Sequence, residues 1–241
     1  MNPKTEPEKK KPKKAAAFFD VDNTILRGSS SYLFGKSAFE RNFFSRKDFW
    51  SFAWHQFRFI WRGENNNVLA SLKDRALLLI AGHRVKDIEE LVEEVYERHI
   101  RLKLWPETVR LAKDHMAEGR EVWLVTAAPQ ELGDVIARRL SLTGAIGTKV
   151  QRKNGILTGD LDGKPVHGPN KRTAIKALAK TRNLSLRKSY AYSDSHNDLP
   201  MLTAVGHPVA VNPDKILTRY AKAADWPIYD FKKRELKANR D

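Results

Sequence analysis

Three short apolar runs, each ending directly in polar residues, constrain the fold of this chain more than any other feature of its sequence. The runs cover residues 15–19, 121–125 and 189–192, and the polar residues that follow them include Asp20, Thr126 and Asp194. A short apolar run bounded by a polar turn is typical of a strand buried in a parallel sheet. A fourth strand is expected near residues 208–211. Because ligands bind beyond the carboxyl ends of such strands, these polar residues mark a candidate site.

Helical patterns separate the expected strands. Pro106 and Glu107 suit the first turn of a helix and Gly119 suits the residue beyond its end, so a helix is predicted over 107–118. Two further helices are expected over 130–140 and 171–181, and Asn154-Gly155 predicts a β-hairpin. Strands that alternate with helices predict an α/β fold with a Rossmann-like parallel sheet. Its core would comprise residues 15–28 and 105–230.

Residues 29–104 break this alternation. They give helical patterns over roughly 31–44, 46–61, 66–81 and 86–100, with no strand pattern among them. An insertion of this size between the first two strands would lie over the carboxyl ends of the strands. We therefore expect residues 29–104 to form a helical cap.

Composition excludes several classes of protein. The chain has 241 residues, a hydrophobic fraction of 41 % and no cysteine, which excludes a disordered chain, a disulfide scaffold, a cysteine-ligated metal site and a thiol nucleophile. No apolar run is long enough to span a membrane, and no secretory signal is visible, so a cytoplasmic protein is expected. The net charge is +15, of which +4 falls in residues 1–14 and +3 in residues 231–241. Both stretches are predicted to be basic tails.

Asp20 and Asp22 are the first candidates for chemistry. Residues two apart on a strand point to the same side, so both carboxylates would enter one crevice. Two carboxylates this close repel each other unless a cation lies between them. The pair therefore indicates either a Mg²⁺ site or a nucleophile beside a general acid and base, and a polar turn after a strand is the structural alternative.

This pattern resembles the haloacid dehalogenase (HAD) superfamily of phosphatases, because each of the four motifs of that superfamily has a match in the expected order. The first is an Asp-x-Asp-x-Thr sequence, the second a Thr that ends a strand, the third a Lys that opens a helix, and the fourth an acidic pair after a strand. The matching residues are Asp20, Asp22 and Thr24, Thr126, Lys171, and Asp194 with Asp198. Lys164 is an alternative for the third motif. The resemblance implies the HAD fold, with the helical insertion as a type I cap.

The resemblance also implies a role for each residue. Asp20 would be the nucleophile that forms an aspartyl-phosphate, and Asp22 the general acid and base. Mg²⁺ would be the cofactor, held by Asp20, the backbone carbonyl of Asp22 and Asp194, with Asp198 acting through water or behind these ligands. The phosphoryl oxygens would bind to Thr126, Ala127 and Lys171.

Residues 193–202 and 206–214 resemble the phosphoserine-phosphatase-like branch, called HAD-IB, which implies a phosphomonoester hydrolase acting on a small phosphorylated metabolite. In that branch Arg75 and Asn197 would contact the substrate. True phosphoserine phosphatases carry a Glu nine residues after the nucleophile, and this chain has Ser29 there. The physiological substrate therefore stays open.

Aromatic residues are concentrated in the expected cap, where residues 32–61 hold twelve of the 23. Packing inside the cap is the simplest interpretation. The alternative is an amphipathic surface that, with the basic tail, makes peripheral contact with a membrane. That alternative would suit a phosphatase of lipid phosphates or a non-enzymatic HAD-derived protein that binds membranes or polyanions. No specific nucleic-acid partner is expected, because no recognition module is present.

Overall fold

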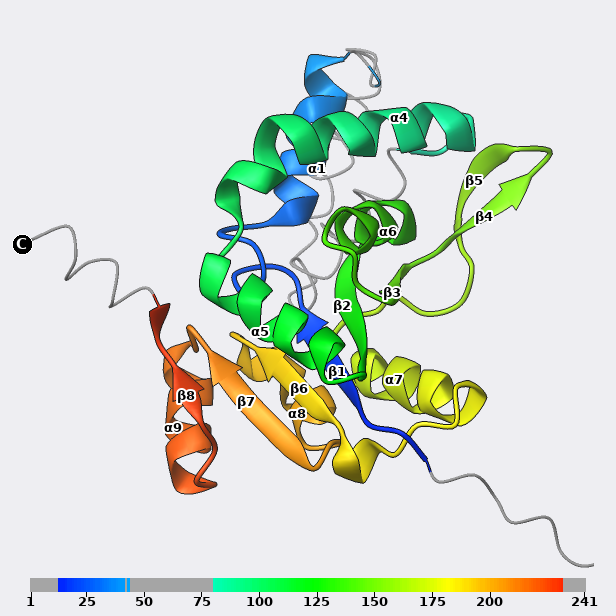
Figure 1. Ribbon diagram of the computed structural model, residues 1–241. Helices are drawn as coiled ribbons and strands as arrows, with labels where there is room; N and C mark the ends of the chain where they lie inside the picture. Colours follow the sequence, from blue (N-terminus) through cyan, green and yellow to red (C-terminus); the bar gives the residue numbers. More distant parts are fainter. Residues whose placement is uncertain (1–12, 42, 44–79, 232–241) are drawn as a thin grey trace, which may run out of the picture.

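A six-stranded parallel sheet forms the centre of the computed structural model, which describes residues 13–41, 43 and 80–231 (Figure 1). Across the sheet the strands run in the order β3 (Gly144–Thr148), β2 (Glu121–Pro129), β1 (Ala16–Asp20), β6 (Tyr190–Ser193), β7 (His207–Val211) and β8 (Ile228–Tyr229). All five adjacent pairs are parallel. From β1 the chain runs outward through β2 to β3 on one side, and it then crosses back to β6 on the other side of β1. β1 therefore lies at the switch point where open sheets bind ligands. The predicted α/β sheet is confirmed.

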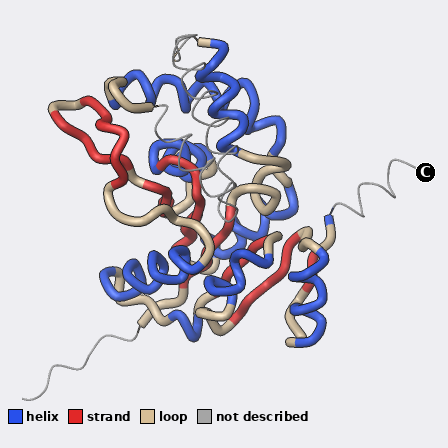
Figure 2. The backbone as a smooth tube through the Cα atoms, turned by 180° about the vertical axis from the view of Figure 1, so that it is seen from behind, coloured by secondary structure: helices blue, strands red, loops and turns tan. Residues whose placement is uncertain are grey.

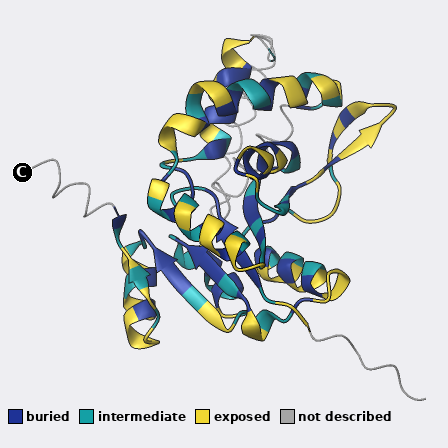
Figure 3. Cartoon of the chain, in the orientation of Figure 1, coloured by how far each residue is buried: buried dark blue, intermediate teal, exposed yellow. Residues whose placement is uncertain are grey.

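Helices cover both faces of the sheet. On one face, α5 (Pro106–Ala117) and α6 (Gln130–Arg139) pack against Ala17 and Phe19 of β1 and their neighbours. On the other face, α7 (Pro169–Thr181), α8 (Leu199–Leu202) and α9 (Lys215–Ala223) pack against Ala16 and Phe18. All five residues of β1 are buried, as Figure 3 shows along the central strands. The alternation of side chains along β1 thus divides the core into two layers.

The described part of the insertion is helical. It contains α1 (Ser30–Glu40), α4 (Val85–Val95), the π-helical turn η1 (Tyr96–Ile100) and the 3₁₀ turn η2 (Arg101–Lys103), and α1 packs beside α4 at one end of the molecule (Figure 1). The helix predicted over 31–44 ends early, at Glu40, while the helices predicted over 46–61 and 66–81 lie outside the described residues except for residues 80 and 81, which form a turn. None of the helices described here is long and apolar enough to cross a membrane.

The aromatic cluster of residues 32–61 is described only at its beginning. Phe34 is buried, whereas Tyr32 and Phe39 expose more than half of their surface. The cluster from residue 44 onward lies outside the described residues. Both interpretations of the cluster therefore remain predictions.

The predicted hairpin is formed by β4 (Val150–Lys153) and β5 (Ile156–Leu161), which extend from the body of the protein (Figure 2). Asn154 and Gly155 both have positive φ, at 53° and 78°, as the two central residues of a type I′ hairpin turn require. Asp160 lies within β5.

The edges of the core differ slightly from the predicted boundaries. Lys14 forms an isolated parallel β-bridge with Leu184. Phe231 is buried, and its backbone N–H donates to Asn212 Oδ1 at 2.8 Å. Lys14 and Phe231 therefore pack with the core, because their hydrogen bonds complete the margins of the sheet.

His115 of α5 is a buried neutral imidazole. Its Nδ1 lies 3.0 Å from Nη1 of Arg120, and because a guanidinium can only donate, Nδ1 is the acceptor. The ring proton is therefore on Nε2, which donates to the Tyr192 hydroxyl at 2.7 Å. Burial, with the nearby positive charge of Arg120, lowers the pKa of His115 to about 4.

Acid is expected to destabilise the fold through His115. Between pH 6.5 and 4 the unfolded chain binds a proton at this residue and the folded chain does not, so the free energy of unfolding falls by about 2 kcal/mol from pH 7.5 to pH 5. Urea unfolding at both pH values should show a smaller loss in His115→Gln, while His207→Gln, which changes an exposed histidine, should behave as the parent. An equal loss in His115→Gln would refute this assignment.

Candidate active site

A cavity of about 280 Å³ opens at the carboxyl ends of β1, β2 and β6. Its lining comes from the turn after β1, the end of β2, the approach to α7 and the loop after β6. The lining residues are Asp20, Asp22, Asn23, Ser29, Thr126, Ala127, His167, Lys171, Asp194, Ser195, Asn197 and Asp198. The topology therefore gathers residues that are up to 178 positions apart into one place.

Lys171 joins two carboxylates at the base of this cavity. Its ammonium donates to Oδ1 of Asp20 and, at 2.7 Å, to Oδ2 of Asp198. Asp198 also accepts from the Ser193 hydroxyl at 2.7 Å, and Asp20 lies 3.4 Å from the Thr24 hydroxyl. The three charged side chains are almost fully buried, so each depends on the others for stabilisation.

Burial and charge set the protonation of this cluster. Burial raises the pKa of Asp20 to about 8, Lys171 opposes that rise, and the carboxylates of Asp198, Asp194 and Asp22 add to it. Burial alone would lower the pKa of Lys171, but Asp20 and Asp198 outweigh burial and hold it above its usual range. Lys171 is therefore a fixed positive charge, and the surroundings of Asp20 carry an excess of negative charge.

Asp22 also lines the cavity, but its partners differ from those of Asp20. Its Oδ1 accepts from the backbone N–H of Ser30 at 2.8 Å and from the Ser30 hydroxyl at 2.5 Å. Its Oδ2 accepts from the Ser29 hydroxyl at 3.1 Å. Asp22 thus depends on the first residues of α1 and is not part of the Lys171 cluster.

Thr126, Ala127 and Asn197 also line the cavity. Thr126 is buried, and its hydroxyl oxygen accepts the N–H of Ala128 at 3.1 Å. The carbonyl of Ala127 accepts from the Thr148 hydroxyl at 2.9 Å, which fixes the last residues of β2. Asn197 is exposed, and both its N–H and its amide Nδ2 donate to the Ser195 hydroxyl at 3.2 and 3.3 Å.

The structure brings together all but one of the site residues named from the sequence. Arg75 lies outside the described residues, so its role stays a prediction. Lys171 lies in the cavity, whereas Lys164 is exposed and does not line it.

Sequence reasoning missed several residues of the cavity. Asn23, Ser195 and His167 also line it, and His167 directly precedes the Gly-Pro that begins α7. His196 bonds to Asp214 Oδ2 through both its backbone N–H and its ring Nδ1, each at 2.8 Å. It thereby ties the loop after β6 to the start of α9.

The donor set is compatible with Mg²⁺. Within the described ranges, no three acidic, histidine or cysteine side chains form a ready metal cage. Mg²⁺ does not need one, because in phosphate-processing sites it binds one or two carboxylates together with substrate oxygens and keeps several waters. The carboxylates that raise the pKa of Asp20 provide the charge that such a cation would offset.

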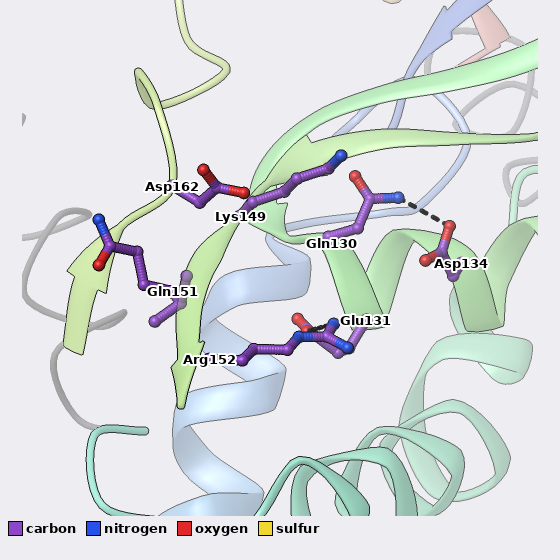
Figure 4. Close-up of a pocket in the computed structure, with 8 residues that line it drawn as sticks. Gln130, Glu131, Asp134, Lys149, Gln151, Arg152 and Asp162 are labelled. Atoms are coloured by element: carbon purple, nitrogen blue, oxygen red, sulfur yellow. Dashed lines mark hydrogen bonds and ion pairs between the residues drawn. The ribbon is translucent and has the colours of Figure 1, made fainter. Parts of the chain in front are cut away.

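A second cavity, of about 680 Å³, lies between the start of α6 and the β4–β5 hairpin (Figure 4). Its side chains largely pair with one another: Gln130 donates to Asp134 at 2.7 Å, and Arg152 donates to Glu131 at 2.7 Å. Of the site residues named from the sequence, those that the structure describes do not line it. Its charges are mixed, so nothing in it selects a phosphate.

Comparison with known proteins agrees with this geometry. The family model for haloacid dehalogenase-like hydrolases matches residues 17–203, and the chain belongs to that family. A Mycobacterium tuberculosis protein named phosphoserine phosphatase SerB1 is 45 % identical over 219 residues, covering 90 % of this chain and 71 % of that protein. A histidinol-phosphatase of Neisseria meningitidis is 28 % identical over 226 residues, covering 91 % of this chain and all of the relative.

Solved structures share the fold. A Bordetella pertussis protein of unknown function has a TM-score of 0.76 at 28 % identity and covers 90 % of this chain and 99 % of its own. A substrate-bound phosphoserine phosphatase has a TM-score of 0.61 at 19 % identity, and the match covers 91 % of this chain and 94 % of that chain. At this identity the likeness shows the fold alone. With the family and the relatives above, the predicted enzyme class is confirmed: the chain is a phosphatase.

Proposed function

We propose that the enzyme is a Mg²⁺-dependent hydrolase of small primary alkyl phosphates that acts through an aspartyl-phosphate on Asp20. The observation that carries the proposal is the buried Asp20–Lys171–Asp198 cluster, with Asp22 held independently across the same cavity. One carboxylate is thus placed for attack and a second, separate one for proton transfer. We propose further that residues 29–104 form a cap over the catalytic core.

Two half-reactions follow from these positions. An oxygen of Asp20 bonds to phosphorus as the phosphorus–alkoxide bond breaks, and Asp22 gives its proton to the departing oxygen, which leaves as the alcohol. Asp22, now a carboxylate, takes a proton from water as that water attacks phosphorus, and the bond between phosphorus and Asp20 breaks to release phosphate. Asp20 and Asp22 return to their starting states.

Phosphoryl oxygens would be held by the donors that surround Asp20. Lys171 supplies a fixed positive charge, while the Thr126 hydroxyl and the N–H of Ala127 supply neutral donors at the end of β2. Asp20, the carbonyl of Asp22 and Asp194 would hold Mg²⁺, with Asp198 beside them. When bound, Mg²⁺ would supply the charge that lets an anionic carboxylate approach an anionic phosphate.

The substrate class follows from the relatives and from Ser29. Phosphoserine and histidinol phosphate, the compounds in the names of two relatives, are both primary alkyl phosphates of small amino alcohols. Ser29 presents a hydroxyl where the resemblance expects a Glu, and that hydroxyl bonds to Asp22. We therefore expect no carboxylate to read a substrate ammonium at this position.

A phosphomonoester panel tests the proposal. Phosphate release should be measured from phosphoserine, histidinol phosphate, glycerol phosphate, lysophosphatidate and p-nitrophenyl phosphate. Highest kcat/KM on a small primary alkyl phosphate is expected. Highest kcat/KM on lysophosphatidate would instead support the lipid-phosphate alternative.

Removing divalent cations is expected to abolish turnover on every substrate of that panel. Without a cation the site cannot offset the repulsion between Asp20 and phosphate, so activity in excess EDTA should fall by about 10³-fold or more. Added Mg²⁺ should restore it, and Ca²⁺ should restore it poorly, because Ca²⁺ prefers more ligands at longer distances. Full activity after exhaustive chelation would contradict the proposed cofactor.

A further inference from the structure

Ser30 makes the closest contacts to the carboxylate of Asp22. Its hydroxyl and its backbone N–H both reach Oδ1, at 2.5 and 2.8 Å. Ser30 is fully buried, so water does not compete for its hydroxyl, and a hydrogen bond to a charged carboxylate in such a place is strong. Ser30 therefore fixes one oxygen of Asp22 firmly.

The two oxygens of Asp22 differ as a result. Oδ1 accepts two hydrogen bonds from Ser30, whereas Oδ2 accepts one, at 3.1 Å, from Ser29. A protonated carboxyl group has one hydroxyl oxygen and one acceptor oxygen. The oxygen that already accepts two donors is the poorer place for a proton, so Oδ2 is the atom that carries it.

Ser29 and Ser30 also connect Asp22 to α1. Ser29 is the N-cap of α1, its hydroxyl oxygen lies 3.4 Å from the N–H of Tyr32, and Ser30 is the first residue of the helix. Helix α1 packs against α4 and β2. The orientation of Asp22 is thus set by how α1 sits on the core.

We propose that Ser30 is a positioning residue for the general acid. It holds Oδ1 of Asp22 so that Oδ2 delivers the proton to the leaving-group oxygen and later receives a proton from the attacking water. This inference rests on the proposed function, since it assigns an atom and an orienting partner to the proton transfer. It gives the serine pair at the start of α1 a role that the four motifs do not include.

The test uses leaving groups of different quality. An alkoxide needs a proton to depart, whereas p-nitrophenolate departs without one. Ser30→Ala should therefore lower kcat on the best alkyl phosphate by about 10- to 100-fold, because a displaced acid loses much of its contribution. On p-nitrophenyl phosphate, the first half-reaction measured as a p-nitrophenol burst should slow by less than about threefold.

A matched control lies in the same helix. Ser37 is also buried, and its hydroxyl has no hydrogen-bond partner among the residues that the structure describes, so Ser37→Ala should leave both rates unchanged. Ser30→Cys, which keeps the shape of the Ser30 side chain with a somewhat larger atom and donates weakly, should repeat the leaving-group dependence if Ser30→Ala does not fold.

Equal slowing on both substrates, in whichever variant folds, would overturn the inference and leave Ser30 a structural residue. The proposed function has a separate test, because Asp20→Asn must be inactive on both substrates whatever Ser30 does. An active Asp20→Asn variant would refute the proposed function itself.

Discussion

Asp20→Asn is expected to lose at least about 10⁴-fold in kcat on every substrate, because an amide cannot serve as the nucleophile. The same variant should melt no lower than the parent at pH 7.5 in EDTA. The folded pKa of Asp20 is raised to about 8 from 3.8, so this residue disfavours folding above pH 4, and the amide removes that cost. Lys171 keeps Asp198 as its partner. Activity and thermal melting of one purified sample test both parts.

Asp160→Asn provides the control for that substitution. Asp160 is exposed on β5, away from the cavity, so its amide should change neither activity nor melting temperature. Residual activity of Asp20→Asn above about one hundredth of the parent would mean that Asp20 is not the nucleophile. A large drop in melting temperature would instead mean that its ionised form stabilises the fold.

Lys171→Met is expected to damage both function and stability. Removing the ammonium leaves Asp20 and Asp198 buried without their counter-charge, which should lower the free energy of unfolding by about 3–5 kcal/mol. Loss of a fixed charge at the phosphoryl oxygens should lower kcat/KM by about 10²- to 10³-fold. Urea unfolding in EDTA and steady-state kinetics measure the two effects.

Lys164→Met distinguishes the two lysines that the sequence left open for the third motif. Lys164 is exposed and does not line the cavity, so its loss should change neither measurement. If Lys164→Met lost activity while Lys171→Met kept it, the assignment of the phosphoryl-binding lysine would be reversed.

The sequence predicted the catalytic core well because local signals and long-range packing agree there. The run before Asp20 is apolar at every position, so it had to be a strand buried on both faces, and β1 has that environment. Gly119 and Asn154-Gly155 have the positive φ angles that their predicted turns require. The four motif positions could be placed because parallel strands present their carboxyl ends on one edge.

Other features depend on contacts that no local pattern reveals. The strand β3, Gly144–Thr148, holds two glycines and one large apolar residue, and it is a strand because it pairs with β2. The strand β8 has two residues and is likewise defined by its partner, β7. The hydrogen bonds between Asp22 and the start of α1 join residues only seven or eight apart, yet their signal, three serines after a glycine, is common in turns.

The central claim is a covalent phosphoryl group on Asp20, and trapping it is the most direct test. Asp22→Asn lacks the base that activates water, so after mixing with p-nitrophenyl phosphate and Mg²⁺ it should release about one equivalent of p-nitrophenol in a burst. Mass spectrometry of the acid-quenched protein should then find phosphate on Asp20. A burst without phosphorylated Asp20, or phosphate on another residue, would contradict the mechanism proposed for this enzyme.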